Sequence, residues 1–271
     1  MSIVSPPQDT HGTSRDHPPG RSRDEYGHAQ RLGRLAGIWF LVTFVTSIPA
    51  LLLYDPLLND ADYILGSGAV ARIQIGALLE IGLVISGIAT ALVFWPVLRR
   101  QSEVLSLGYV ASRITESALI ATGIVSVLAV LTLREDLGSS AVGLDTTGQA
   151  LVAVHDATFL LGPAVCAGLG NGLLLGWLLY KSGLVPPRWA LVGVIGGPIA
   201  FLGAILVLFG AFDNTSAAKF LFTVPEIVWE LFVGIYLTFH GYRSEPLRRL
   251  LGQDTEHAGL EDASRPAVTA P

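Results

Sequence analysis

Residues 73–98 read IQIGALLEIGLVISGIATALVFWPVL and contain one charged side chain, Glu80. An apolar run of about 20 residues is long enough to cross the roughly 30 Å hydrocarbon core of a bilayer as a helix. Lipid cannot satisfy free backbone N–H and C=O groups, so an open chain crosses it only in helical form. The stretch therefore predicts a transmembrane helix that carries a carboxyl group inside the membrane.

Five further runs of this kind predict an all-α integral membrane bundle of six helices. The chain is 51% apolar and only 14% charged, and its mean hydropathy is +0.55. A soluble domain of this size needs a more charged surface, so a soluble protein with a large core is the weaker alternative. The predicted spans are residues 34–54, 73–98, 105–133, 151–180, 189–211 and 220–240.

Polar segments flank the predicted transmembrane domain, which covers residues 34–243. Residues 1–33 are rich in Pro, Gly, Ser, Asp and Arg, and they lack the apolar segment of a cleaved signal peptide. We expect this segment and residues 244–271 to be disordered tails.

The distribution of Lys and Arg predicts the orientation of the helices. Basic residues gather in both tails and in the connections after the second and fourth spans. The opposite side would hold only Arg72, Arg134 and Lys219. By the positive-inside rule, both termini should therefore lie in the cytoplasm. We expect the lipid bilayer, and no nucleic acid, as the main partner.

Most Trp and Tyr residues lie near predicted span ends. This placement is typical of the aromatic belts that anchor helices at the membrane interface. The residues assigned to these belts are Trp39, Trp95, Trp177, Trp189, Tyr54, Tyr109, Tyr180 and Tyr242.

Ionisable side chains inside the predicted spans are the main candidates for a functional site. A charge at the centre of a membrane helix costs roughly 2.5–3.5 kcal/mol on insertion scales, so these side chains should point into the bundle. Pairs three or four residues apart share a helix face. At 1.5 Å per residue, most of these side chains also lie at similar depths in the membrane, so they should form one cluster in the outer half of the bundle. The candidates are Glu80, Arg113, Glu116, His155, Asp156, Glu226 and Glu230, with the amide of Asn171 nearby in the fourth span.

Five of these candidates are acids, whereas Arg113 is the one obligatory cation and His155 a second potential one. Desolvation and repulsion between like charges should keep some of the acids neutral, or else the site must hold water, protons or a cation. One hypothesis is a small transporter-like or sensing protein with a proton- or cation-responsive cavity, closed at its base by Arg113 and Glu116. The alternative is a non-catalytic scaffold or partner protein in which the buried charges hold the helices in register.

The sequence contains little that points to an enzyme. A zinc site needs several His or Cys ligands, and only His155 is well placed. The single cysteine, Cys166, excludes a disulfide within the chain. The serines in the third span have no His on their own helix, and no Gly-rich phosphate loop occurs. We therefore expect no catalytic residues, metal or cofactor.

Small residues and prolines shape the predicted helices. Gly168, Gly172 and Gly176 recur every four residues in the fourth span, a spacing that lets two membrane helices approach closely. We expect this seam to form a contact inside the bundle, with a homo-oligomer as the alternative. Pro163, in the same span, removes a backbone hydrogen bond and favours a kink.

Three segments together resemble a known family. They are Arg113-Ile-Thr-Glu116, the stretch GWLLYKSGLVPPRW at residues 176–189, and Pro225-Glu226 with Glu230. In their order and spacing they resemble the bacterial six-span membrane proteins catalogued as domain of unknown function 4386, over roughly residues 30–243.

Two motifs of that family have counterparts in this chain. Its Arg-x-x-Glu motif corresponds to Arg113 and Glu116, and its Lys-Ser-Gly-x-x-Pro turn begins at Lys181; Pro187 is an addition in this chain. The resemblance implies six spans in a bacterial cytoplasmic membrane, and it implies no activity.

Overall fold

The computed structural model describes residues 19–60, 62–66, 68–137 and 142–252. Within these ranges the chain is helical and contains no strand. The elements are α1 (Pro19–Asn59), the short 3-10 helix η1 (Tyr63–Leu65), α2 (Val70–Leu98), α3 (Glu103–Leu137), α4 (Leu144–Phe159), the π-helical segments η2 (Leu160–Cys166) and η3 (Gly168–Leu175), α5 (Gly176–Ser182), α6 (Pro187–Leu208) and α7 (Ala217–His240). Residues 244–252 form a further short helix.

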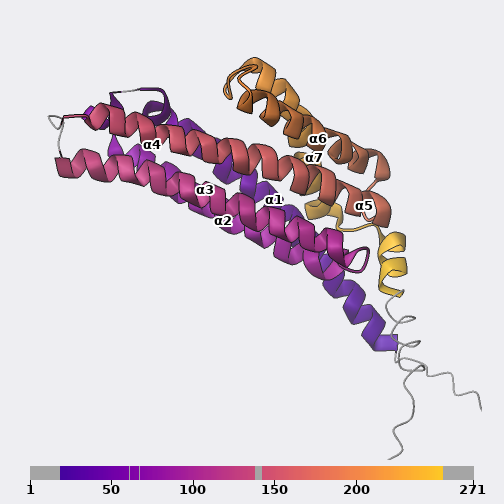
Figure 1. Ribbon diagram of the computed structural model, residues 1–271. Coiled ribbons are helices and arrows are strands. Elements are labelled where there is room, and N and C mark those ends of the chain that lie inside the picture. The colour runs from indigo at the N-terminus through magenta and orange to yellow at the C-terminus, as the bar shows by residue number, and fades with distance from the viewer. Residues whose placement is uncertain (1–18, 61, 67, 138–141, 253–271) are drawn as a thin grey trace, which may run out of the picture.

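Six of these helical stretches are long and apolar enough to cross a membrane, which confirms the predicted all-α six-span architecture. The fourth span is composite and runs from Leu144 to Ser182 through α4, η2, η3 and α5. Consecutive spans pack against one another and α7 returns to α1, so the six spans form a closed ring. In Figure 1 the α6–α7 pair diverges from α4 toward the α6–α7 connection.

The beginning of α1 and the end of α7 lie at the same end of this ring, which we call the terminal end. The Gln30 side chain donates to the Tyr242 carbonyl (2.8 Å) and accepts from the Tyr242 N–H (3.0 Å). The opposite end, with η1 and the α3–α4 and α6–α7 connections, is the loop end. Which end faces the cytoplasm stays a prediction based on Lys and Arg.

Helical structure extends into both segments that we expect to be tails. The first helix begins at Pro19 rather than Arg34, and helix resumes after α7 over residues 244–252. These extensions pack on each other at the terminal end, where Ala29, Leu247 and Leu250 are buried and Arg248 lies over the Tyr26 ring. The rest of the predicted tails, residues 1–18 and 253–271, lies outside the described residues.

Aromatic side chains fill the ring interior at the terminal end. The Phe94 ring makes edge contacts with Phe40 and Tyr109, at centroid distances of 6.1 and 6.0 Å, and a tilted contact with Tyr242 at 6.5 Å. All four rings are buried. We call these four residues the aromatic plug, because together they close the bundle at this end.

Part of the predicted interfacial belts is wrong, because three of the tyrosines are buried; two of these belong to the aromatic plug. Tyr54, Tyr109 and Tyr242 lie inside the bundle instead of at its surface. Position near a span end does not reveal which face of the helix a tyrosine occupies, and these three occupy inner faces.

The middle of the fourth span is wound as a π-helix, in which each turn is wider than in an α-helix. Pro163 cannot donate a backbone hydrogen bond, which disturbs the α-helical ladder at this point. Side chains of neighbouring helices bond carbonyls of this segment: Ser112 donates to Cys166 (2.8 Å) and the Trp229 indole to Asn171 (2.8 Å). The wide turns are thereby tied to α3 and α7.

The glycine seam of the fourth span packs against α6. A Cβ atom at Gly168 would lie 2.8 Å from the Gly197 carbonyl oxygen, and one at Gly176 would lie 2.9 Å from the Val194 nitrogen. Gly172 directly faces the Gly197 backbone. This seam is occupied within the chain, so it is not free to bind a second copy.

Gly168→Ala should lower the free energy of unfolding by about 1–3 kcal/mol, because the new methyl group would force the backbones of η3 and α6 apart. The measurement is the midpoint of detergent-induced unfolding, followed by circular dichroism. Gly108→Ala is the matched control, since its Cβ would meet Leu174 at an ordinary 3.4 Å. Equal midpoints for the two variants would contradict close packing at the seam.

Candidate functional site

Arg113 is buried at the middle of the bundle, and its Nη1 and Nε atoms have partners on α3 and α2. Its Nη1 lies 2.6 Å from Glu116 Oε2, and its Nε donates to the Gly87 carbonyl and to Thr90 Oγ1, each at 3.2 Å. Thr90 itself donates to the Gly87 carbonyl (2.6 Å). The side chain is only 4% exposed. The ion pair of α3 is therefore held in place by polar groups of α2.

Gly87 makes this arrangement sterically feasible. A Cβ atom at this position would lie 3.1 Å from Arg113 Nη2 and 2.9 Å from Ser117 Oγ. Any larger residue would push the guanidinium away from the α2 carbonyl that it binds.

Helix α7 contributes two further carboxyl groups. Asn171 Nδ2 donates to Glu230 Oε1 (2.5 Å), and Glu230 is near enough to Arg113 for electrostatic interaction. One turn earlier, Glu226 is 4% exposed and presses against Gly172. Neither Glu226 oxygen has a hydrogen-bond partner among the described residues. These two acids are near enough to interact electrostatically, and the described protein groups leave both Glu226 oxygens unused.

A cavity of about 150 Å³, which we call the central cavity, lies between these helices. Arg113, Glu116 and Glu230 supply its charged wall, and Thr43 and Ser47 of α1 add two hydroxyl groups. Its complete lining is Thr43, Phe44, Ser47, Leu83, Arg113, Glu116, Ile120, Phe159, Pro163, Ala167 and Glu230. At about 30 Å³ per water molecule, the space suits a few waters or a small hydrated ion.

A second polar group, nearer the loop end, consists of Tyr54, Glu80 and His155. Glu80 interacts electrostatically with His155 and faces the Tyr54 hydroxyl. The His155 ring makes an edge contact with Tyr54 (5.7 Å) and stacks on Phe159 (4.5 Å). The Tyr54 hydroxyl, Glu80 Oε2 and both His155 nitrogens have no hydrogen-bond partner of normal geometry among the described residues.

The structure therefore divides the predicted cluster into two groups. Glu80 lies on α2, as does Gly87, whose carbonyl accepts from Arg113. At 1.5 Å per residue, these two positions are about 10 Å apart along the helix axis. Ile120 and Phe159 lie between the two groups. The central group contains Arg113, Glu116, Glu226 and Glu230, and the loop-end group contains Glu80 and His155.

Asp156 belongs to neither group. Its side chain is 60% exposed, and its Oδ1 lies 3.6 Å from His155 Nδ1, which is too long for a hydrogen bond. It lines a groove of about 340 Å³ at the loop end, which we call the loop-end groove. The groove is formed by Leu51, Leu52, Asp55, Leu58, Asn59, His155, Asp156, Phe159, Asn214 and Thr215.

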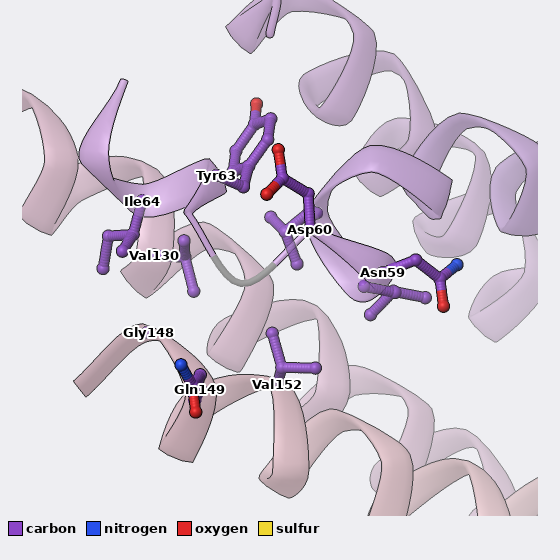
Figure 2. Close-up of a pocket in the computed structure, with 10 residues that line it drawn as sticks. Asn59, Asp60, Tyr63, Ile64, Val130, Gly148, Gln149 and Val152 are labelled. Atoms are coloured by element: carbon purple, nitrogen blue, oxygen red, sulfur yellow. The ribbon is translucent and has the colours of Figure 1, made fainter. Parts of the chain in front are cut away.

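Another cavity, of about 240 Å³, opens beside η1, and none of the predicted site residues lines it. Figure 2 shows its mixed wall, with Asp60 and Tyr63 on one side and Gln149 and Val152 on a facing helix. Arg134 lies over the Tyr63 ring (4.9 Å) and donates to the Gly66 carbonyl (2.8 Å). Burial raises the pKa of the Tyr63 hydroxyl, which therefore stays neutral at physiological pH.

Sequence reasoning overlooked three residues of these sites. Tyr54 is typical of an interfacial anchor, and Thr90 and Phe159 are common residues in membrane helices. The signal that could have found Tyr54 and Thr90 is their helix face. Tyr54 lies four residues after Ala50 on the buried face of α1, and Thr90 lies three after Gly87.

Comparison with known families gives one match. The family model described as domain of unknown function (DUF4386) matches residues 35–241, which cover most of the membrane-spanning bundle. Both polar groups fall within the matched region. No curated protein and no solved structure matches the chain.

Arg113→Ala should lower the free energy of unfolding by about 3–5 kcal/mol, because it leaves the Glu116 carboxylate buried without its partner. The double variant Arg113→Met with Glu116→Met should recover most of that loss, since it removes both charges. Detergent-unfolding midpoints of the purified variants test this. Arg249→Ala, which breaks an exposed pair with Glu245, is the control and should leave the midpoint unchanged. A double variant as unstable as the single one would show that the charges themselves are not the cause.

Proposed function

This chain belongs to the DUF4386 family, and from that premise we propose that it is a small transporter-like or ligand-sensing membrane protein whose central cavity takes up a proton or a small cation. The observation that carries the proposal is that the cavity wall holds Glu230 in addition to the Arg113–Glu116 ion pair, with the Glu226 carboxyl beside Glu230. We further propose the bacterial cytoplasmic membrane as its location, as the family resemblance implies. The distribution of Lys and Arg supports both termini in the cytoplasm.

Charge balance favours a positive ligand. Glu116 neutralises Arg113, and the remaining guanidinium contacts go to the Gly87 carbonyl and Thr90. Glu226 and Glu230 then remain as two further acids. Neither Glu226 oxygen has a partner among the described residues, and Asn171 donates to one Glu230 oxygen. Acids at membrane depth require a proton or a cation to offset the cost of desolvation.

The size of the cavity restricts the ligand class. About 150 Å³ holds a proton on a carboxyl group with a few waters, an alkali cation or a small ammonium ion. It excludes metabolites of nucleotide size unless the helices move apart. Thr43 and Ser47 supply hydroxyl oxygens opposite the charged wall, and neutral oxygen ligands of this kind suit hard monovalent cations.

A membrane scaffold is the second candidate function. It is favoured by the contacts of Arg113, which pairs with Glu116 on α3 and donates to the Gly87 carbonyl of α2. Such contacts hold α2 against α3, as a purely structural ion pair would. The two candidates differ in what they require of Glu226 and Glu230, since a scaffold needs neither acid to change its protonation or its partner.

Glu230→Gln should abolish cation uptake while preserving the fold, because the amide oxygen can still accept from Asn171 but cannot bind a proton or balance a cation. We expect proton flux in proteoliposomes, driven by a potassium diffusion potential and followed by an internal pH dye, to fall at least about tenfold. Thermal unfolding in detergent with sodium, potassium or methylammonium chloride provides a binding readout that also covers a sensor. The melting temperature of the unmodified protein should rise with one of these cations, and that of Glu230→Gln should not.

Glu245→Gln is the matched control, because Glu245 is exposed and lies beyond the last span. It should behave as the unmodified protein in both assays. If the unmodified protein shows neither flux nor a cation-dependent melting temperature, or if Glu230→Gln retains both, the scaffold becomes the better explanation.

A further inference from the structure

Two facing helix stripes connect the loop-end groove with the central cavity. On α1, Thr43 and Ser47 line the cavity, and Leu51 and Asp55 line the groove. These four residues are spaced four apart, so they lie on one face of the helix.

The opposite wall has the same continuity. Asp156 lines the groove, Phe159 lines both spaces, and Pro163 and Ala167 line the cavity. Their spacing of three or four residues again defines a single face, which runs from α4 into η2. The groove and the cavity are therefore successive parts of one track between α1 and the fourth span.

Phe159 is the narrow point of this track. It is the one residue that lines both spaces, and its ring is held by stacking on the buried His155 at 4.5 Å. His155 is in turn packed against Tyr54. An aromatic side chain fixed on one side and bordered by open space on the other can change rotamer without disturbing the helix backbone.

The terminal end offers no comparable route. The aromatic plug, with Phe94 at its centre, fills the ring interior there, and its four rings are buried. Along the axis of the ring, the open approach to the central cavity is therefore from the loop end in this conformation.

The mouth of the track carries negative charge. Asp55 and Asp156 face the groove from opposite walls, and both side chains are exposed. Among the described residues, no Lys or Arg lines the groove, and its one imidazole, His155, is buried behind Asp156. Acids at the mouth of a cleft raise the local concentration of cations and lower that of anions.

We infer that the loop-end groove is the cation-selective entrance to the central cavity, and that Phe159 is the residue that closes it. The inference deepens the proposed function, because it names the route and the charge class of the ligand. Asp55 and Asp156 select for cations at the mouth, and the Phe159 ring separates the mouth from Glu116 and Glu230. A cation that passes the ring also meets an aromatic face, to which it is attracted.

Thiol labelling tests the route without requiring transport. Because Cys166 is the only cysteine, Cys166→Ser gives a background into which single probes can be placed. Leu51→Cys reports on the groove and Ser47→Cys on the cavity. The reagents are two methanethiosulfonates, one with a trimethylammonium group and one with a sulfonate group, applied to the full chain in nanodiscs.

Phe159→Ala should accelerate cationic labelling of Ser47→Cys at least about tenfold, and Phe159→Trp should slow it. Labelling of Leu51→Cys should change little in either variant, because Leu51 lies outside the narrow point. Ser126→Cys is the control for a general loosening of the bundle, since Ser126 is buried between α3 and α4 and bonded to the Leu151 carbonyl. Its reactivity should stay low throughout.

Asp55→Asn combined with Asp156→Asn should reduce the preference for the cationic over the anionic reagent at both probes by several-fold. Unchanged Ser47→Cys rates in both Phe159 variants would overturn the route, and so would a parallel rise at Ser126→Cys. Equal labelling by the two reagents in the parent protein would overturn the cation selectivity. If the labelling pattern is as expected and Glu230→Gln nevertheless retains cation uptake, the route stands and the proposed function fails.

Discussion

The buried guanidinium of Arg113 is the constraint around which the middle of this bundle is built. A permanent charge in hydrocarbon is tolerated only with partners in place, and here the partners come from two helices. Glu116 neutralises the charge, and Gly87 and Thr90 of α2 accept its remaining hydrogen bonds. Gly87 must lack a side chain for this to happen. Much of the packing of α2 against α3 thus serves one side chain.

The fourth span positions the polar side chains of α7. Its π-helical turns place Asn171 so that its amide reaches Glu230 while its carbonyl accepts from Trp229. The same segment brings Gly168 and Gly172 against the Gly197 backbone of α6. The wide helix therefore docks the α6–α7 pair and positions the acids of α7 at the cavity. One irregular segment accounts for both contacts.

The sequence predicts the number of spans well because the length of an apolar run and the thickness of a bilayer are directly comparable. It also predicts that charged side chains avoid lipid, because a charge in hydrocarbon has a high free energy. The structure buries Glu80, Arg113 and Glu116. It does not predict which charges meet, because helical spacing defines a face and leaves the neighbour undefined. Helical spacing alone therefore groups Glu80 with Arg113, although Ile120 and Phe159 lie between them. The π-helical turns and the helix at residues 19–33 depend on tertiary contacts, such as Gln30 with Tyr242, that no local pattern reveals.

The buried polar side chains are of two kinds, and the difference bears on function. Arg113 and Glu116 neutralise each other through one short contact. Glu80, Tyr54, His155 and Glu226 are equally buried but retain atoms that no described residue satisfies. Buried polar atoms without partners cost about 1–3 kcal/mol each, so a chain that keeps several of them must gain something in return. A purely structural role would favour pairing all of them or replacing them with apolar side chains. His155 lines the loop-end groove and Glu226 neighbours Glu230 of the central cavity, so a proton, a cation or its water shell in these two spaces would lie close to unused atoms.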